Sequence, residues 1–157
     1  MDMKMRAIIS LWVCILVVLP STAFAQLVSL ASHKGQVVYL DFWASWCTPC
    51  KASFPFMNEL NDQLASQGLV VLAVNVAEQR AAADRFLQQT PARFRIAYDP
   101  KGLTPEQYKV KAMPTAVLID RKGQVRHVHA GFRDRDRDAL RAQVESLLKE
   151  TLPKEAP

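Results

Sequence analysis

The stretch DFWASWCTPCK, residues 41–51, places two cysteines three positions apart, between an apolar run and a segment with helical spacing. Residues 37–42 are apolar except for Asp41, a pattern typical of a strand that is covered on both faces of a parallel sheet. After Cys50, apolar residues recur at spacings of three and four as far as Leu64, which predicts a helix. The cysteines therefore stand at the junction of a buried strand and a helix N-terminus.

This position predicts reactive thiols. Backbone N–H groups and the helix dipole stabilise negative charge at a helix N-terminus, which lowers the pKa of a thiol placed there. We expect Cys47 to face solvent and attack a disulfide, and Cys50, one turn further in, to resolve the mixed disulfide. A purely structural crosslink is a weaker interpretation, because a disulfide that closes so short a loop stabilises little.

Asp41 is the candidate for the proton transfer that activates Cys50. An aspartate inside an apolar strand is expected to be buried, and burial raises the pKa of a carboxyl group. Such a group accepts a proton from a thiol directly or through a water molecule. The alternative is an acid at a strand end that simply reaches solvent.

The N-terminal segment has the pattern of an export signal. A basic start precedes the apolar run 7–19, and residues 23–25 form an A-x-A cleavage site. We expect residues 1–25 to be a signal peptide and the mature protein to be periplasmic, with an uncleaved membrane anchor as the alternative. Cleavage removes Cys14 and leaves one cysteine pair in a compartment that permits disulfides.

The composition indicates a single domain. The chain has 157 residues, of which 50% are apolar and 22% charged, and this suffices for one core. We assign residues 26–150 to this domain and residues 151–157 to a flexible tail. The formal net charge of +5 is mild and no basic stripe with interleaved aromatic residues is present, so nucleic-acid binding is not expected.

The rest of the mature chain alternates predicted strands and helices. A second buried strand at 69–76 completes a right-handed β-α-β unit with the first strand and its helix. The short helix expected at 104–108 has Thr104 as its N-cap and Pro105 at its first position. The other expected elements are an edge strand at 27–30, a helix within 78–89, a strand at 94–98, an antiparallel hairpin of strands 115–120 and 125–130, and a C-terminal helix marked by residues 140–148. This order predicts an α/β fold with a central mixed sheet flanked by helices.

Two groups of residues carry a resemblance to a known family. The segments DFWA, WC and PCK within residues 41–51, together with Pro55, resemble thioredoxin, with Thr48 where that family usually has glycine. The run VKAMPT, residues 110–115, resembles the cis-proline segment of the same family. The predicted α-β pair inserted between Glu78 and Gly102 and the export signal resemble exported thioredoxin-like proteins of the TlpA and ResA type. The resemblance implies a thioredoxin fold.

The resemblance also implies further site residues. Pro114 is expected to be cis and to pack against the disulfide, while the Met113 backbone pairs with an extended substrate segment. Trp46 and Pro49 are expected to contribute to the substrate-binding surface, and Glu78 to modulate the protonation of the cysteines. From the residues alone, the alternatives are a trans proline, a core tryptophan and a solvated loop glutamate.

The function that the resemblance implies is that of a thiol-disulfide oxidoreductase that reduces protein disulfides, as in relatives that keep the haem-binding cysteines of apocytochrome c reduced. A membrane thiol-electron carrier is then implied as electron donor, no cofactor is needed, and membrane contact follows only if the N-terminal segment stays uncleaved. The spacing does not fix the direction of electron flow, so a thiol oxidant or a disulfide isomerase stays open. The non-enzymatic alternative is a metal-binding module formed by Cys47, Cys50, His127 and His129.

Overall fold

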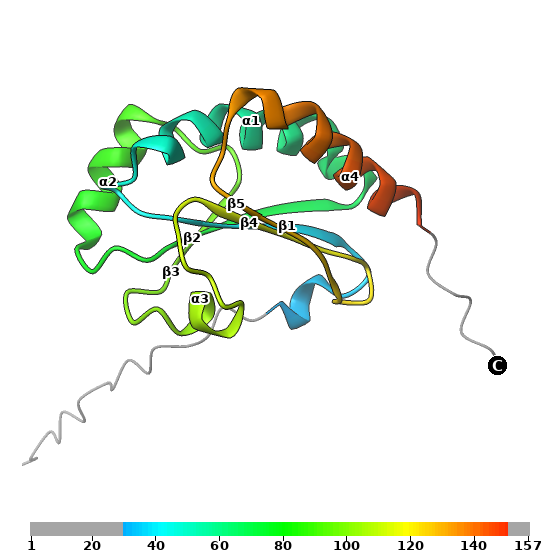
Figure 1. Ribbon diagram of the computed structural model, residues 1–157, viewed down its shortest axis with the longest axis horizontal. Helices are drawn as coiled ribbons and strands as arrows, with labels where there is room; N and C mark the ends of the chain where they lie inside the picture. The colour runs from blue at the N-terminus through cyan, green and yellow to red at the C-terminus, as the bar shows by residue number, and fades with distance from the viewer. Residues whose placement is uncertain (1–29, 151–157) are drawn as a thin grey trace, which may run out of the picture.

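The computed structural model describes residues 30–150 (Figure 1). The expected signal peptide, the expected tail and all but the last residue of the expected strand at 27–30 lie outside this part of the chain. Within it, no helix combines the length and the hydropathy that a membrane span requires.

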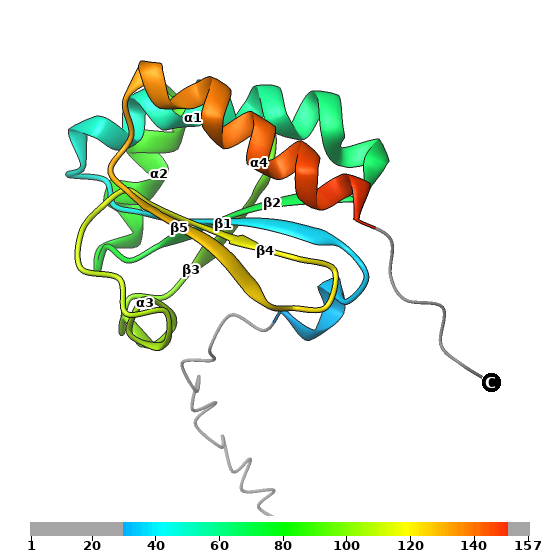
Figure 2. The same cartoon turned by 45° about the vertical axis from the view of Figure 1, so that its right-hand side comes forward.

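Five strands form one mixed sheet in the order β3-β2-β1-β4-β5 (Figures 1 and 2). The central strand β1 (Val37–Trp43) is parallel to β2 (Leu69–Asn75) and antiparallel to β4 (Thr115–Ile119). The edges are β3 (Arg95–Tyr98), parallel to β2, and β5 (Val125–Ala130), antiparallel to β4. The predicted strands within residues 30–150, the β-α-β unit and the antiparallel hairpin are confirmed.

Helices cover both faces of the sheet. Three of them, α1 (Thr48–Leu64), α2 (Arg80–Gln89) and α4 (Arg137–Lys149), lie on one face, while α3 (Leu103–Gln107) lies on the other (Figure 1). Short 3-10 helices complete the described chain at η1 (Ala31–His33), η2 (Ala65–Gln67) and η3 (Asp134–Asp136). The α/β fold with a mixed sheet flanked by helices is confirmed.

The alternation of side chains along β1 divides the core into two layers. Tyr39 and Trp43 pack in the cluster that includes α1, α2 and α4, whereas Phe42 faces the opposite layer and contacts Tyr108 at 5.9 Å between ring centroids. All seven residues of β1 are buried, as expected for a central strand. Because side chains alternate along a strand, Asp41 points to the same face as Tyr39 and Trp43, beneath α1.

The two ends of α1 have clear physical causes. Its N-cap is Cys47, and Pro49 lies in the first turn. Proline suits this turn because backbone N–H groups there have no acceptor within the helix, so its missing N–H costs no helical hydrogen bond. The helix continues through Pro55 and passes into η2, which ends at Gly68 with φ of +98°. A glycine suits this position, because a side chain there would adopt the left-handed conformation and would lie 2.9 Å from the guanidinium of Arg121.

One predicted helix boundary is wrong. The N-cap of α3 is Gly102 and not Thr104, so Thr104 and Pro105 lie inside the helix. The backbone N–H of Thr104 donates to Oδ2 of Asp99 at 2.5 Å. A buried carboxylate from the preceding turn therefore satisfies the helix start, a role that the sequence pattern had given to the threonine hydroxyl.

Candidate active site

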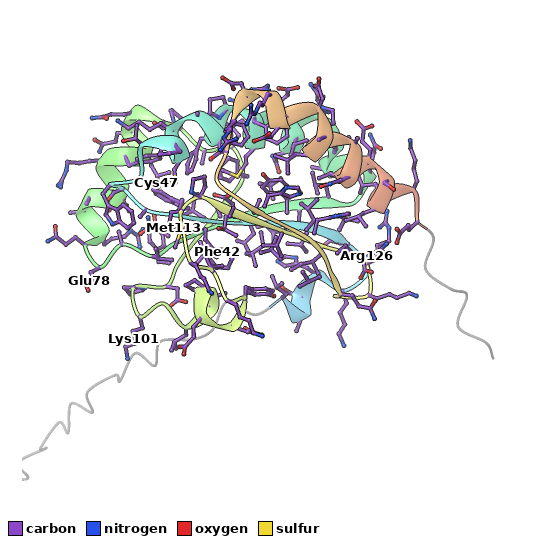
Figure 3. The ribbon with its side chains drawn as sticks, viewed as in Figure 1. Phe42, Cys47, Glu78, Lys101, Met113 and Arg126 are labelled. Carbon is purple, nitrogen blue, oxygen red and sulfur yellow. A yellow bond between two sulfur atoms is a disulfide. The ribbon has the colours of Figure 1, made fainter. Side chains whose placement is uncertain are left out.

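The predicted cysteine pair forms a disulfide at the N-terminus of α1 (Figure 3). The two sulfurs of Cys47 and Cys50 are 2.05 Å apart. The backbone N–H of Cys50 also donates to Sγ of Cys47 at 3.3 Å. A helix N–H that points at this sulfur, together with the helix dipole, stabilises negative charge on it when the pair is reduced. The geometry thus favours a thiolate at Cys47 once the pair is reduced.

Cys47 is less accessible than the sequence predicted. Its exposed fraction is 3%, against 0% for Cys50, so the order of exposure agrees with the prediction but the solvent-facing position of Cys47 does not. The reason is that the first turn of α1 packs onto the end of β1, where Trp43 and Ala44 are fully buried in the same cluster as both cysteines. The adjacent Trp46 is 72% exposed instead, which excludes a core role for that side chain.

Asp41 is buried beneath α1, as the sequence predicted, with an exposed fraction of 1%. Its neighbours across the two adjoining strands are Ala73 of β2 and Ala116 of β4, whose apolar side chains offer the carboxyl group no hydrogen bond. Its Oδ2 has no hydrogen-bond partner. Burial raises the pKa of Asp41 well above its ordinary value, because the charged form loses its hydration.

Tyr39 shares the layer of Asp41 and was not predicted as part of the site. Its ring packs edge-on against Phe56 of α1, with centroids 6.4 Å apart. Burial, and then the negative charge of Asp41, raise the pKa of Tyr39 well above its ordinary value. The phenol therefore stays neutral at physiological pH. The only sequence signal for it was the strand alternation that puts residues 39 and 41 on one face.

The peptide bond between Met113 and Pro114 is cis, as the resemblance implied. Two hydrogen bonds hold this segment: Pro114 O accepts from Gly131 N–H at 2.7 Å, and the Thr115 hydroxyl donates to Ala112 O at 2.7 Å. The Met113 backbone makes no hydrogen bond within residues 30–150. Its polar groups are therefore open to pairing with an added extended segment. Figure 3 shows Met113 on the same side of the molecule as Cys47.

The loop between β2 and α2 carries Glu78 next to Trp46. Glu78 is exposed, and both side chains line one hollow together with Val76. In Figure 3, Glu78 lies at the outer edge of the molecule below Cys47. The loop is fixed by Asn75, whose buried Oδ1 accepts the backbone N–H of Ala77 at 3.1 Å. The two acids named from the sequence thus occupy different environments, Asp41 in the core and Glu78 at the surface.

The residues of the metal-binding alternative are not gathered into a site. Cys47 and Cys50 are oxidised to a disulfide, and His127 stacks on His129 along the edge strand β5. Nε2 of His129 lies 2.6 Å from Oε1 of Gln143 on α4. Within residues 30–150, no three histidine, cysteine or acidic side chains are grouped so as to hold a metal ion. The histidines therefore have a structural explanation at the junction of β5 and α4.

Comparison with known proteins places the chain in a family. The sequence profile of the redoxin family matches residues 17–146. The chain belongs to the redoxin family. Its relatives include the thiol-disulfide oxidoreductase ResA of Geobacillus kaustophilus, 36% identical over 102 residues, which are 65% of this chain and 59% of that protein. ResA of Bacillus thuringiensis is 32% identical over 126 residues, or 80% and 69% of the two chains. The chain thus spans 59% of the length of the first of these redoxin relatives.

Solved structures confirm the thioredoxin-like fold of this redoxin. A Chlorobium tepidum structure assigned to the thiol:disulfide interchange protein DsbE is 50% identical, with a TM-score of 0.74 over 76% of this chain and 84% of that one. The exposed lipoprotein thioredoxin Etrx1 of Streptococcus pneumoniae is 31% identical, with a TM-score of 0.66 over 75% and 90% of the two chains. The fold that the resemblance implied is therefore confirmed.

Proposed function

We propose that this redoxin is an extracytoplasmic thiol-disulfide oxidoreductase that reduces protein disulfides through Cys47 and Cys50. The observation that carries the proposal is a disulfide at a helix N-terminus above a fully buried carboxyl group that lacks a partner for one oxygen. The similarity to ResA proteins supports the same chemistry.

The proposed cycle transfers two electrons to the substrate. The Cys47 thiolate attacks one sulfur of a substrate disulfide, so that a mixed disulfide forms and the other substrate sulfur leaves as a thiolate. The Cys50 thiolate then attacks Sγ of Cys47, which restores the Cys47–Cys50 disulfide and releases the second substrate thiolate. The substrate ends as a dithiol and the enzyme as a disulfide.

Asp41 is the proposed proton acceptor for Cys50. A fully buried thiol such as Cys50 resists ionisation, since burial disfavours the thiolate. Because the pKa of Asp41 is raised, it lies closer to the pKa of a thiol, and proton transfer from Cys50 to Asp41 costs less free energy. Glu78, which lies beside Trp46 at the surface, is the proposed second acid and acts on the more exposed side of the pair.

The surface around Cys47 is the proposed substrate-binding site. The Met113 backbone pairs with an extended substrate segment, Pro114 holds it against the sulfurs, and Trp46 and Pro49 supply exposed contact area. Main-chain pairing accepts many sequences, which suits an enzyme that acts on protein disulfides. The resemblance suggests the haem-binding cysteine pair of apocytochrome c as one substrate and a membrane thiol-electron carrier as the donor that restores the dithiol.

The proposal is tested by trapping. Cys50→Ser lacks the resolving thiol, so we expect it to accumulate mixed disulfides with its substrates through Cys47, visible on non-reducing gels and identifiable by mass spectrometry. Cys47→Ser is the matched control and should trap nothing. Recovery of no mixed disulfide from cells that express Cys50→Ser would overturn the proposed function.

The direction of electron flow is tested separately. We expect a reduction potential nearer to that of thioredoxin, about −270 mV, than to that of a dedicated periplasmic oxidant, about −120 mV. Equilibration of the protein with glutathione or dithiothreitol buffers, read by alkylation of the free thiols, measures this potential. A value near the oxidant would assign the chain to the thiol oxidants instead.

A further inference from the structure

A groove between α1 and α2 begins at Ser45 and Trp46, just before the cysteine pair, and apart from Trp46 it has no part in the proposed function. Two adjoining hollows form it, one next to Trp46 and one next to Pro55, and they share Lys51 and Gln89. Figures 1 and 2 both show the start of α1 beside α2. We call this surface the α1–α2 groove and define it by the residues Trp46, Lys51, Pro55, Arg85, Gln89 and Arg93.

The charge of the α1–α2 groove has one sign. Its lining contains Lys51, Arg85 and Arg93 but no aspartate or glutamate. Arg93 is neutralised by an ion pair with Asp62 at 2.6 Å. Lys51 and Arg85 are exposed, and neither forms an ion pair among the described residues. Two cations therefore face the groove without a counter-charge.

The groove is continuous with the site through Trp46. This side chain lines the hollow of Glu78 on one side and the hollow of Lys51 and Arg85 on the other. Trp46 also immediately precedes Cys47, the proposed attacking cysteine, in the sequence. A substrate segment joined to Cys47 by a mixed disulfide thus has a path across the exposed indole into the α1–α2 groove.

On this basis, which rests on the proposed function, we infer that the enzyme prefers protein disulfides flanked by an acidic segment. The substrate disulfide lies at Cys47, an apolar side chain of the substrate packs on Trp46, and the acidic residues lie against Lys51 and Arg85. Charge complementarity of this kind mainly raises the association rate and selects among partners, and salt screens it.

The test uses three oxidised peptides that contain one disulfide and differ only in a flanking block of glutamate, glutamine or lysine. Single-turnover rate constants are measured with the pre-reduced protein by acid quench and chromatography. We expect the glutamate peptide to react about tenfold faster than the lysine peptide at low salt, as two surface charge pairs allow, and the ratio to approach one at high salt.

Charge reversal locates the effect. The double variant Lys51→Glu, Arg85→Glu should reverse the preference so that the lysine peptide reacts faster. The ratio of two peptides is the readout because a change at Lys51 also alters the electrostatics of the neighbouring cysteines, and this affects both peptides alike. Lys122→Glu, an exposed change in the turn between β4 and β5, is the control and should keep the preference for glutamate.

Four outcomes overturn the inference, and they differ in what they say of the proposed function. If the glutamine peptide is reduced but the glutamate and lysine peptides react alike, or if the double variant keeps the wild-type ratio, the inference is wrong and the proposed function stands. If no peptide is reduced, both fail. If sedimentation shows a dimer that the double variant abolishes, a second copy of this chain occupies the groove instead.

Discussion

Asp41 and Asp120 are both buried, but they lie at opposite ends of the sheet and differ in the hydrogen bonds that their carboxyl groups accept. Asp41, near the cysteines, has small alanines on either side and no partner for Oδ2. Asp120, at the start of the β4–β5 turn, accepts the backbone N–H groups of Lys122 and Gln124 at 2.9 Å each. Its Oδ2 also accepts from Arg126 at 3.3 Å.

The pKa values of the two carboxyl groups shift in opposite directions for this reason. Burial alone raises the pKa of Asp41. Burial is also the largest single influence on Asp120, but the hydrogen bonds from Gln124, Lys122 and Arg126 together outweigh it and lower the pKa. The hydrogen bonds at the turn end stabilise the charged form of Asp120, whereas Asp41 at the cysteine end has a raised pKa, as the proposed proton transfer requires.

The two ends of the sheet also differ in how many buried polar groups are hydrogen-bonded, and Arg121 shows this at the turn end. Its guanidinium donates to the carbonyl oxygens of Gly35, Gln67 and Leu148, and it thereby ties together three segments that meet at the turn end. At the cysteine end, polar groups of buried side chains are left without partners at Oδ2 of Asp41, Nε1 of Trp43 and Nδ2 of Asn75. Unsatisfied groups of this kind are costly in a core, which is why their concentration near the disulfide points to function.

Among these predictions, the substitution Asp41→Asn should have the largest effect, and this effect is on the catalytic rate. An amide of the same size does not accept the Cys50 proton, so we expect resolution of the mixed disulfide at neutral pH to slow by about 100-fold or more. Rapid-quench measurement of mixed-disulfide decay checks this, with Glu78→Gln as the comparison at the surface. An unchanged decay rate would remove Asp41 from the mechanism and weaken the contrast between the two ends.

The same variant should be more stable than the wild type, and increasingly so as pH rises. Between the ordinary pKa of an aspartate, about 3.9, and its raised value in the fold, the folded protein holds a proton that the unfolded chain has lost. Wild-type stability therefore falls as pH rises through this window, and the Asn variant lacks that fall. Urea midpoints of the oxidised proteins from pH 5 to 9 measure the difference, and parallel curves would contradict the raised pKa of Asp41.

Arg121→Ala should lower the free energy of unfolding by about 2–3 kcal/mol, because three carbonyl oxygens lose a charged donor and two of these bonds are partly buried. The rate of disulfide exchange should not change, since the contacts lie at the turn end. The control is Arg135→Ala, whose side chain is 72% exposed and whose ion pair spans 3.9 Å, with an expected change within about 0.5 kcal/mol. Equal losses in the two variants would show that Arg121 does not tie the three segments together.

Asp120→Ala should lower the free energy of unfolding by about 2 kcal/mol at pH 7, because two backbone N–H groups of the turn lose their acceptor. A carboxyl group with a lowered pKa in the fold stabilises above its ordinary pKa, and this contribution is lost as pH falls through the lowered value. The difference between wild type and variant should therefore shrink below about pH 4. Chemical denaturation at pH 7, 5 and 3 tests this, and a difference that grows toward acid pH would reverse our assignment.

Glu59→Gln should have the smallest effect. Glu59 on α1 accepts hydrogen bonds from Arg137 and Arg141 of α4, at 2.5 and 2.6 Å, but all three side chains are partly exposed. We expect a loss of less than about 1 kcal/mol that diminishes in 1 M salt. Glu145→Gln, which alters a single pair at 3.7 Å, is the matched control and should lose less. If the loss of unfolding free energy did not depend on salt, Glu59 would stabilise the protein through packing and not through its charge.

Local patterns predicted most of the architecture because they depend on neighbours in sequence. Two seven-residue buried strands and the helix that begins at the cysteine pair were read from hydrophobic periodicity. The start of α3 was misplaced, since its cap comes from Asp99 through a turn that the pattern of residues 104–108 does not encode. The burial of Cys47 was also missed, because it depends on how α1 packs onto the end of β1.

The sequence by itself identified the groups on which the proposed chemistry rests: two cysteines at a helix start, an acid in a buried strand and a proline before a late strand. The cysteine pair and the acid follow from residue type and spacing, which act over one or two turns of chain, whereas the role of the proline follows from the resemblance to thioredoxin. Only the tertiary structure decided that Oδ2 of Asp41 would lack a partner while both oxygens of Asp120 would be hydrogen-bonded, and that Lys51 and Arg85 would line one groove beside Trp46. Those outcomes depend on which strands and helices come together, and burial and hydrogen bonding across them set the charge state of each group.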